Sequence, residues 1–237
     1  MATGTCAVFL QLKTISDKWA SIATSLTSQN AMDHLPPQYE GTLLAGYLAQ
    51  RTILAERFTS SKSAVMEVPF QGAPGGSFVL QKPLSRGSLN LDPANPYGEP
   101  IVDFQTFQNP IDITILIESF RFVRKWLAQD SHQALGAVES PLSSNLTTDA
   151  QIEDFIRRTG TGTIAHPSGT NAMMPLELGG VVDSGLSVHG VKRLSIVDAS
   201  IIPLIPGTHL CATVYAIAEK VSSSNTPLQN IIVQGKF

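Results

Sequence analysis

Residues 162–220 decide the fold and read GTIAHPSGTNAMMPLELGGVVDSGLSVHGVKRLSIVDASIIPLIPGTHLCATVYAIAEK. They hold three of the five histidines, short apolar runs separated by glycines, and a long apolar segment at the end. The short runs predict short strands joined by turns, and the long segment predicts a helix over 209–221. We interpret the preceding residues as support for this stretch.

Two histidines of this stretch share a local context. His166 is followed by Pro167 and Gly169, which fix a loop that can aim the imidazole into a cleft. His209 opens the apolar helix, whose first backbone amides favour an anion or an electron-rich ring edge. Because imidazole titrates near neutral pH, such a pair can take a proton from an alcohol. We interpret the other histidines as surface or turn residues: His34, His132 and His189.

The composition is that of a globular protein. With 237 residues, 43% of them hydrophobic and 15% charged, the chain can bury one good core or two small ones. The net charge of −3 leaves no basic footprint, so we expect no nucleic-acid partner. No run approaches the roughly 18 apolar residues of a membrane span. Residues 1–16 lack the basic region of a secretory signal, so we expect a cytoplasmic location.

The chain contains two cysteines, Cys6 and Cys211. They are too few for a disulfide framework and do not have the spacing of metal ligands, so no metal site is predicted. Cys211 falls within the last predicted helix. We expect it to be a small buried apolar residue rather than a nucleophile.

Helical patterns recur in the first 160 residues. Apolar spacing predicts helices over 16–32, with Ser16 as N-cap, and over 40–58, where Gly41 and Gly46 lower the intrinsic propensity. Asn109 and Pro110 predict the start of a third helix, which runs to about residue 128. A capping-box pattern predicts a short helix after Thr148, with Gln151 as the reciprocal partner.

Strand patterns lie between these helices. Residues 63–70, 77–91 and 100–107 read as strands, and Pro83 breaks the middle run into two. We interpret Ser85 and Arg86 as residues that shape the crossover between strands rather than as residues that bind substrate. Turns rich in glycine and proline favour antiparallel pairing. We therefore predict an α+β fold with a mainly antiparallel sheet flanked by helices, a domain boundary near residue 160, and C-terminal strands and a helix after it.

The run of residues 166–220 resembles the C-terminal signature of the glucose–methanol–choline (GMC) oxidoreductases. These are FAD-dependent alcohol oxidases and dehydrogenases, including fungal aryl-alcohol and glucose oxidase types. The earlier runs KPLSRGSLNL, PIVDF and NPIDITILIESFRFVRKWL look like the substrate domain of that family. The resemblance implies a partial substrate-binding domain over 1–160, a segment returning to an incomplete FAD domain over 161–237, and FAD as the cofactor.

The resemblance also implies two catalytic residues. His166, in its H-P-x-G-T context, matches the family histidine that faces the flavin and the substrate hydroxyl. His209 matches the second active-site histidine, although some members have asparagine there. In the family the pair positions the alcohol and one of the two accepts its proton, while hydride passes from the carbinol carbon to flavin N5.

The same resemblance implies four cofactor-binding residues. Asp198 and Ala199, in VDASIIP, match the turn that contacts the flavin. The backbone amides of Leu210 and Cys211 would lie near the flavin pyrimidine edge, where helix polarity favours an anionic ring.

The G-x-G-x-x-G motif that binds the dinucleotide in this family does not occur in the sequence. The resemblance is therefore to the C-terminal part of such an enzyme. Without the dinucleotide unit, the apolar faces of strands in 181–197 and of the last helix would be exposed. That exposure favours self-association or pairing with a complementing N-terminal half.

Several functions are open at this point. We expect FAD-linked oxidation of the CH–OH group of a small-molecule alcohol, with the nearest resemblance to fungal members that include enzymes of secondary metabolism. One alternative is a partner half that completes a flavin site with another chain. A second is FAD-free, non-redox cyclisation or dehydration of a polyketide-like substrate by the same histidine pair. A non-catalytic binding role is the remaining alternative.

Overall fold

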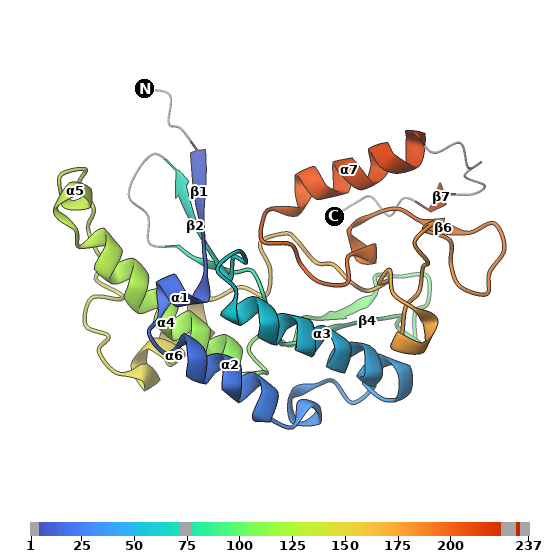
Figure 1. Ribbon diagram of the computed structural model, residues 1–237, viewed down its shortest axis with the longest axis horizontal. Helices are drawn as coiled ribbons and strands as arrows, with labels where there is room; N and C mark the ends of the chain where they lie inside the picture. The colour runs from blue at the N-terminus through green and yellow to red at the C-terminus, as the bar shows by residue number, and fades with distance from the viewer. Residues whose placement is uncertain (1–4, 72–76, 224–230, 233–237) are drawn as a thin grey trace.

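The strands of the N-terminal part pair antiparallel. The computed structural model describes residues 5–71, 77–223 and 231–232 (Figure 1). Within them, one sheet has the strand order β1-β2-β3, and β4 and β5 form a separate ribbon. The break predicted at Pro83 lies between β3 and β4. The bounds are β1 (Thr5–Leu10), β2 (Met66–Gln71), β3 (Val79–Leu80), β4 (Ser88–Asn90) and β5 (Ile101–Asp103).

Helices and small sheets both contribute to the fold, and the predicted α+β class with mainly antiparallel pairing is confirmed. None of the helices in the described ranges is long and apolar enough to cross a membrane. The α-helices are α1 (Leu12–Ile15), α2 (Trp19–Ser28), α3 (Gly41–Thr59), α4 (Pro110–Leu127), α5 (Asp130–Gln133), α6 (Asp149–Thr159) and α7 (Leu210–Ser223). Short 3₁₀ turns are η1 (Ala31–His34), η2 (Leu176–Leu178) and η3 (Ala199–Ile201).

Helix α4 organises the core. It begins as predicted, because the Ile111 amide donates a 3.0 Å hydrogen bond to Asn109 Oδ1 and Pro110 needs no amide partner in the first turn. One side of α4 packs with α1, α2 and α3 around the fully buried Leu54. Another side packs on α6 around the fully buried Ile152. These two clusters place α4 between the N-terminal helices and α6.

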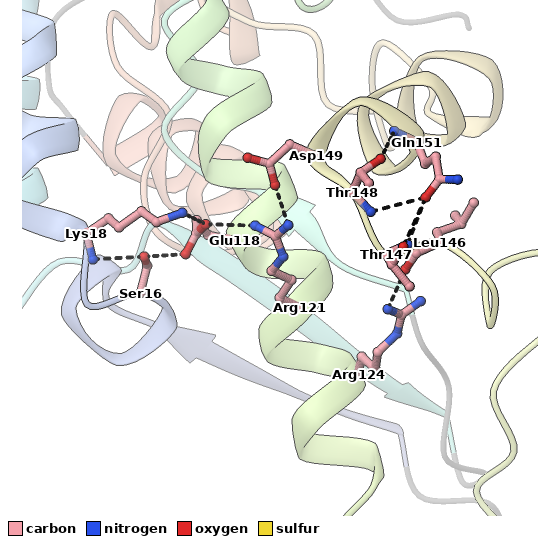
Figure 2. Close-up of polar contacts among 10 residues, drawn as sticks. All are labelled: Ser16, Lys18, Glu118, Arg121, Arg124, Leu146, Thr147, Thr148, Asp149 and Gln151. Carbon is pink, nitrogen blue, oxygen red and sulfur yellow. Dashed lines mark hydrogen bonds and ion pairs between the residues drawn. The ribbon is translucent and has the colours of Figure 1, made fainter.

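The helix predicted over 16–32 was wrong at its start. Ser16 is not the N-cap of α2; it is the C-cap of α1, and its hydroxyl donates to Glu118 on α4 at 2.5 Å (Figure 2). Lys18 Nζ donates to the same carboxylate at 2.8 Å, and Arg121 approaches it at 3.4 Å. This tertiary contact turns the chain between α1 and α2, which local helical preference alone could not reveal.

The start of α6 follows the predicted capping box. The Gln151 amide donates to Thr148 Oγ1 at 3.3 Å, and the Thr148 amide donates back to Gln151 Oε1 at 3.1 Å (Figure 2). Arg121 pairs with Asp149 in the first turn, and Arg124 donates to the loop before α6. Both arginines therefore anchor α6 to α4.

The crossover after β3 is held by a buried carboxylate. Asp112 on α4 accepts hydrogen bonds from the backbone amides of Leu84 and Ser85, each at 2.8 Å, and from the Ser85 hydroxyl at 2.6 Å. Arg86 donates to Gln50 on α3 at 3.0 Å. Burial raises the Asp112 pKa, and the Ser85 and Leu84 hydrogen bonds oppose that rise. These contacts support a structural role for Ser85 and Arg86.

After residue 160 the chain forms the short runs and turns that were predicted. The short strands predicted within 181–197 are present as one two-residue strand, β6 (Ser195–Ile196), parallel to β7 (Ile231–Ile232), and as isolated bridges that join Val182 to Val188 and Ser187 to Ser195. Frequent turns leave too few successive residues for longer pairing. Helix α7 closes this part and packs on it through one apolar stripe that includes Leu210 and Val221. In Figure 1 this part lies at the end of the molecule opposite α4–α6.

Candidate active site

The two predicted histidines lie together. The ring centroids of His166 and His209 are 5.3 Å apart, and the ring planes meet at 87°. The loop after His166 runs beside η3, where the Asn171 amide donates to the Ser200 carbonyl at 3.0 Å. His209 immediately precedes α7. The fold therefore brings the pair into contact, while their catalytic roles stay a prediction.

The local backbone orients His166. Its amide donates to Thr163 Oγ1 at 2.8 Å, which closes a short turn. Ala165, directly before it, adopts φ +59°, a left-handed conformation that costs an L-residue about 1 kcal/mol. A residue keeps this strained conformation only where the surrounding structure enforces it, and strained residues cluster at functional sites.

Glu67 joins the pair and was missed by the sequence reasoning. It lies on β2, is fully buried at 0% exposure, and has Oε1 2.5 Å from His209 Nε2. Gln81 Nε2 donates to its other carboxylate oxygen at 2.7 Å. The sequence offered one signal for it, a single glutamate inside an otherwise apolar strand pattern. Since a carboxylate is seldom buried without a partner, a glutamate in that position indicates a paired carboxylate.

This contact gives the two nitrogens of His209 different surroundings. An ionised carboxylate can only accept hydrogen bonds, so toward ionised Glu67 the donor is His209 Nε2. On His166, Nε2 is buried and has no hydrogen-bond partner within the described residues. The two imidazoles are therefore not equivalent: Glu67 engages one of them, and the other has an unused buried nitrogen.

The predicted cofactor turn contains a second unused polar atom. Asp198 caps η3, and its Oδ1 accepts the Ser200 amide at 2.8 Å. Its Oδ2 is buried without a partner among the described residues. Ala199 packs against the apolar cluster that includes Leu210, so the turn and the start of α7 share one core.

Cys211 differs from expectation, because it is exposed rather than buried. The buried stripe of α7 passes through Leu210 and Val221, and Cys211 lies one residue, or about 100°, away from that stripe. It therefore presents the second residue of α7 to solvent. His189 also differs: it is half-buried, with Nε2 3.1 Å from the Met174 carbonyl oxygen.

These residues fit the expected flavin. A carboxylate oxygen that can only accept, such as Asp198 Oδ2, suits a ribityl hydroxyl, and the positive end of α7 suits an electron-rich ring edge. For metals, no group of three or more His, Cys, Asp or Glu in the described ranges could hold an ion.

Comparisons with known proteins point to one family. A sequence model described as GMC oxidoreductase matches residues 83–218. Patulin synthase of Aspergillus clavatus is 34% identical over 206 residues, which are 84% of this chain and 31% of that protein. Across the curated relatives, the matched region covers 22% to 34% of their length, so this chain spans about a third of them or less.

Two solved structures share the fold. An FAD-dependent oxidoreductase from Chaetomium thermophilum superposes with a TM-score of 0.85 at 32% identity, covering 93% of this chain and 38% of that one. A fungal aryl-alcohol oxidase superposes with a TM-score of 0.81 at 34% identity, covering 91% of this chain and 37% of that one. The likeness therefore extends over nearly all of this chain.

Proposed function

The chain belongs to the GMC oxidoreductase family, and on that premise we propose that it contributes the histidine side of an FAD-linked oxidation of an alcohol CH–OH group. The observation that carries the proposal is the edge-to-face pair of His166 and His209 with the Glu67 carboxylate behind it. The likeness to an aryl-alcohol oxidase supports a small-molecule alcohol as the substrate class. The likeness to patulin synthase supports a role in fungal secondary metabolism.

In this proposal the two histidines have different roles. His209 is held by Glu67 and keeps its proton on Nε2, so it orients the substrate hydroxyl through Nδ1 or through its ring edge. The buried Nε2 of His166 has no hydrogen-bond partner in the described part of the chain, and this nitrogen accepts the hydroxyl proton. Removing that proton builds negative charge on the substrate oxygen and weakens the carbinol C–H bond.

The remaining site residues hold the cofactor. Asp198 Oδ2 and the first amides of α7, at Leu210 and Cys211, are the groups that bind it, and Ala199 packs the turn against the core. FAD, when bound, supplies the acceptor for the hydride of the carbinol carbon.

The test is a visible absorption spectrum of the purified protein with added FAD. We expect a bound flavin band at about one equivalent, bleached by benzyl alcohol without oxygen. His166→Ala and His209→Ala should retain the band and far-UV circular dichroism but slow bleaching by about 10²–10⁴-fold, the usual contribution of a positioned acid or base. His34→Ala, which changes a histidine outside the site, is the matched control.

Two outcomes would oppose the proposal. A folded protein that binds no flavin would remove the redox reaction and favour the non-redox use of the same histidines. Unchanged bleaching in both histidine variants would instead show that flavin is reduced without them. The first result would contradict FAD as the cofactor, and the second would contradict the catalytic role of the two histidines.

A further inference from the structure

A cavity of about 590 Å³ lies beside the loop that leads into His209. Its size falls within the roughly 300–1,000 Å³ of small-molecule sites. Phe9, Leu54 and Leu204 supply apolar lining, and Gly207 borders it on the loop. Neither histidine of the candidate active site is among its lining residues.

Positive charge gathers at this cavity. Arg57, near the end of α3, Lys62, just after it, and Lys82, just after β3, all line the wall. The lining residues, all from the described part of the chain, include no aspartate or glutamate. The side chains of Arg57 and Lys62 have no ion pair or hydrogen bond among the described residues. The described lining therefore includes three basic side chains and no carboxylate.

Lys82 distinguishes this wall from an ordinary solvated surface. It is only 8% exposed, and its ammonium group donates to the Ile205 carbonyl. Burying an ammonium without a counter-charge is costly, because a carbonyl replaces only part of its lost hydration. Burial, together with the nearby Arg57 charge, lowers the Lys82 pKa to about 8. A bound anion would offset both the lost hydration and the repulsion.

We propose that this cavity binds a small organic anion, a carboxylate attached to an apolar body. The carboxylate lies between Lys82 and Arg57, and the apolar body packs on Phe9, Leu54 and Leu204. Lys62, at the rim, adds long-range attraction. The inference uses none of the flavin-site residues and is independent of the oxidoreductase proposal.

Calorimetric titration of the purified protein with benzoate tests the proposal. Benzamide, which has the same shape without the charge, is the matched ligand, and inorganic phosphate is the anion without an apolar body. We expect benzoate to bind about tenfold or more tightly than either one, since a charge-assisted hydrogen bond exceeds a neutral one and the ring adds burial. Arg57→Gln and Lys82→Met should each weaken benzoate by about tenfold, and Lys62→Gln by less.

The matched control is Lys125→Gln, which removes an exposed positive charge from α4 outside the cavity and should leave benzoate binding unchanged. Arg57 is exposed, so its variant keeps the test valid if Lys82→Met does not fold. Equal binding of benzoate and benzamide, or unchanged benzoate binding in Arg57→Gln, overturns the anion site. If phosphate binds as tightly as benzoate, the ligand needs no apolar body, and that part of the proposal is wrong.

Discussion

Replacing Glu67 with leucine tests the carboxylate behind the histidine pair. The two oxygens of Glu67 accept one hydrogen bond each, from Gln81 at 2.7 Å and from His209 at 2.5 Å. Leucine fills a similar volume and accepts neither. Gln81 is 5% exposed, so its amide would be left buried and unpaired, whereas the His209 side chain is 47% exposed and can turn to water.

The size of the effect follows from this asymmetry. A buried donor without a partner costs about 1–3 kcal/mol, so we expect Glu67→Leu to lower the free energy of unfolding by about 2 kcal/mol, nearly all through Gln81. Replacing both partners by apolar groups is close to neutral. The double variant Glu67→Leu with Gln81→Leu should therefore recover most of the loss. Without the carboxylate, the proton of His209 is no longer held on Nε2 and both tautomers become populated.

Urea unfolding measures the stability, and long-range ¹H–¹⁵N NMR of the imidazoles measures the tautomer. Glu56→Leu is the matched control, because Glu56 is exposed on α3 and its side chain has no polar contact within the described residues. Two results would contradict this prediction. One is a Glu67→Leu variant within about 0.5 kcal/mol of the parent, the usual range of a surface change. The other is a His209 that keeps a single Nε2–H tautomer.

Two further predictions concern pH and packing. Burial raises the pKa of Glu118, but hydrogen bonds from Lys18 and Ser16 and the charge of Arg121 outweigh it, so the folded-state pKa lies below the usual value of about 4.3. The stability that this group contributes is present above the usual pKa and is lost as pH falls through the folded-state pKa. Glu118→Gln should therefore flatten the acid side of the profile of unfolding free energy against pH, measured with urea. An unchanged profile would contradict this prediction. Gly46→Ala should gain about 1 kcal/mol of helix propensity, yet the new Cβ would lie 2.1 Å from the carbonyl oxygen of residue 178, and overpacking costs about 1–3 kcal/mol. We expect a lower unfolding midpoint, and a higher one would show that propensity dominates.

Several elements could be predicted from the sequence because the residues that form them are neighbours in the chain. The start of α4 depends on Asn109 and Pro110, and the start of α6 on Thr148 and Gln151, so hydrogen bonds within one turn decide both. Helix α7 follows from its apolar spacing. The family resemblance singled out the histidine pair, since its motif is contiguous around each residue.

Other features required the tertiary structure. Ser16 ends a helix because Glu118, 102 residues later, binds its hydroxyl. Gly46 lies in the middle of α3 because η2 packs directly against it, which no helix propensity predicts.

The class of the fold, the local helix starts and the pair of histidines follow from the order of residues, because each rests on spacing or on contacts between neighbours in the chain. The contact of Glu67 with His209, 142 residues later, and the burial of Lys82 near Arg57 arise only when the chain folds. The physical reason is the same in both cases. Burial and pairing depend on which distant segments meet, and the free energy of a charge depends on its surroundings rather than on its neighbours in the chain.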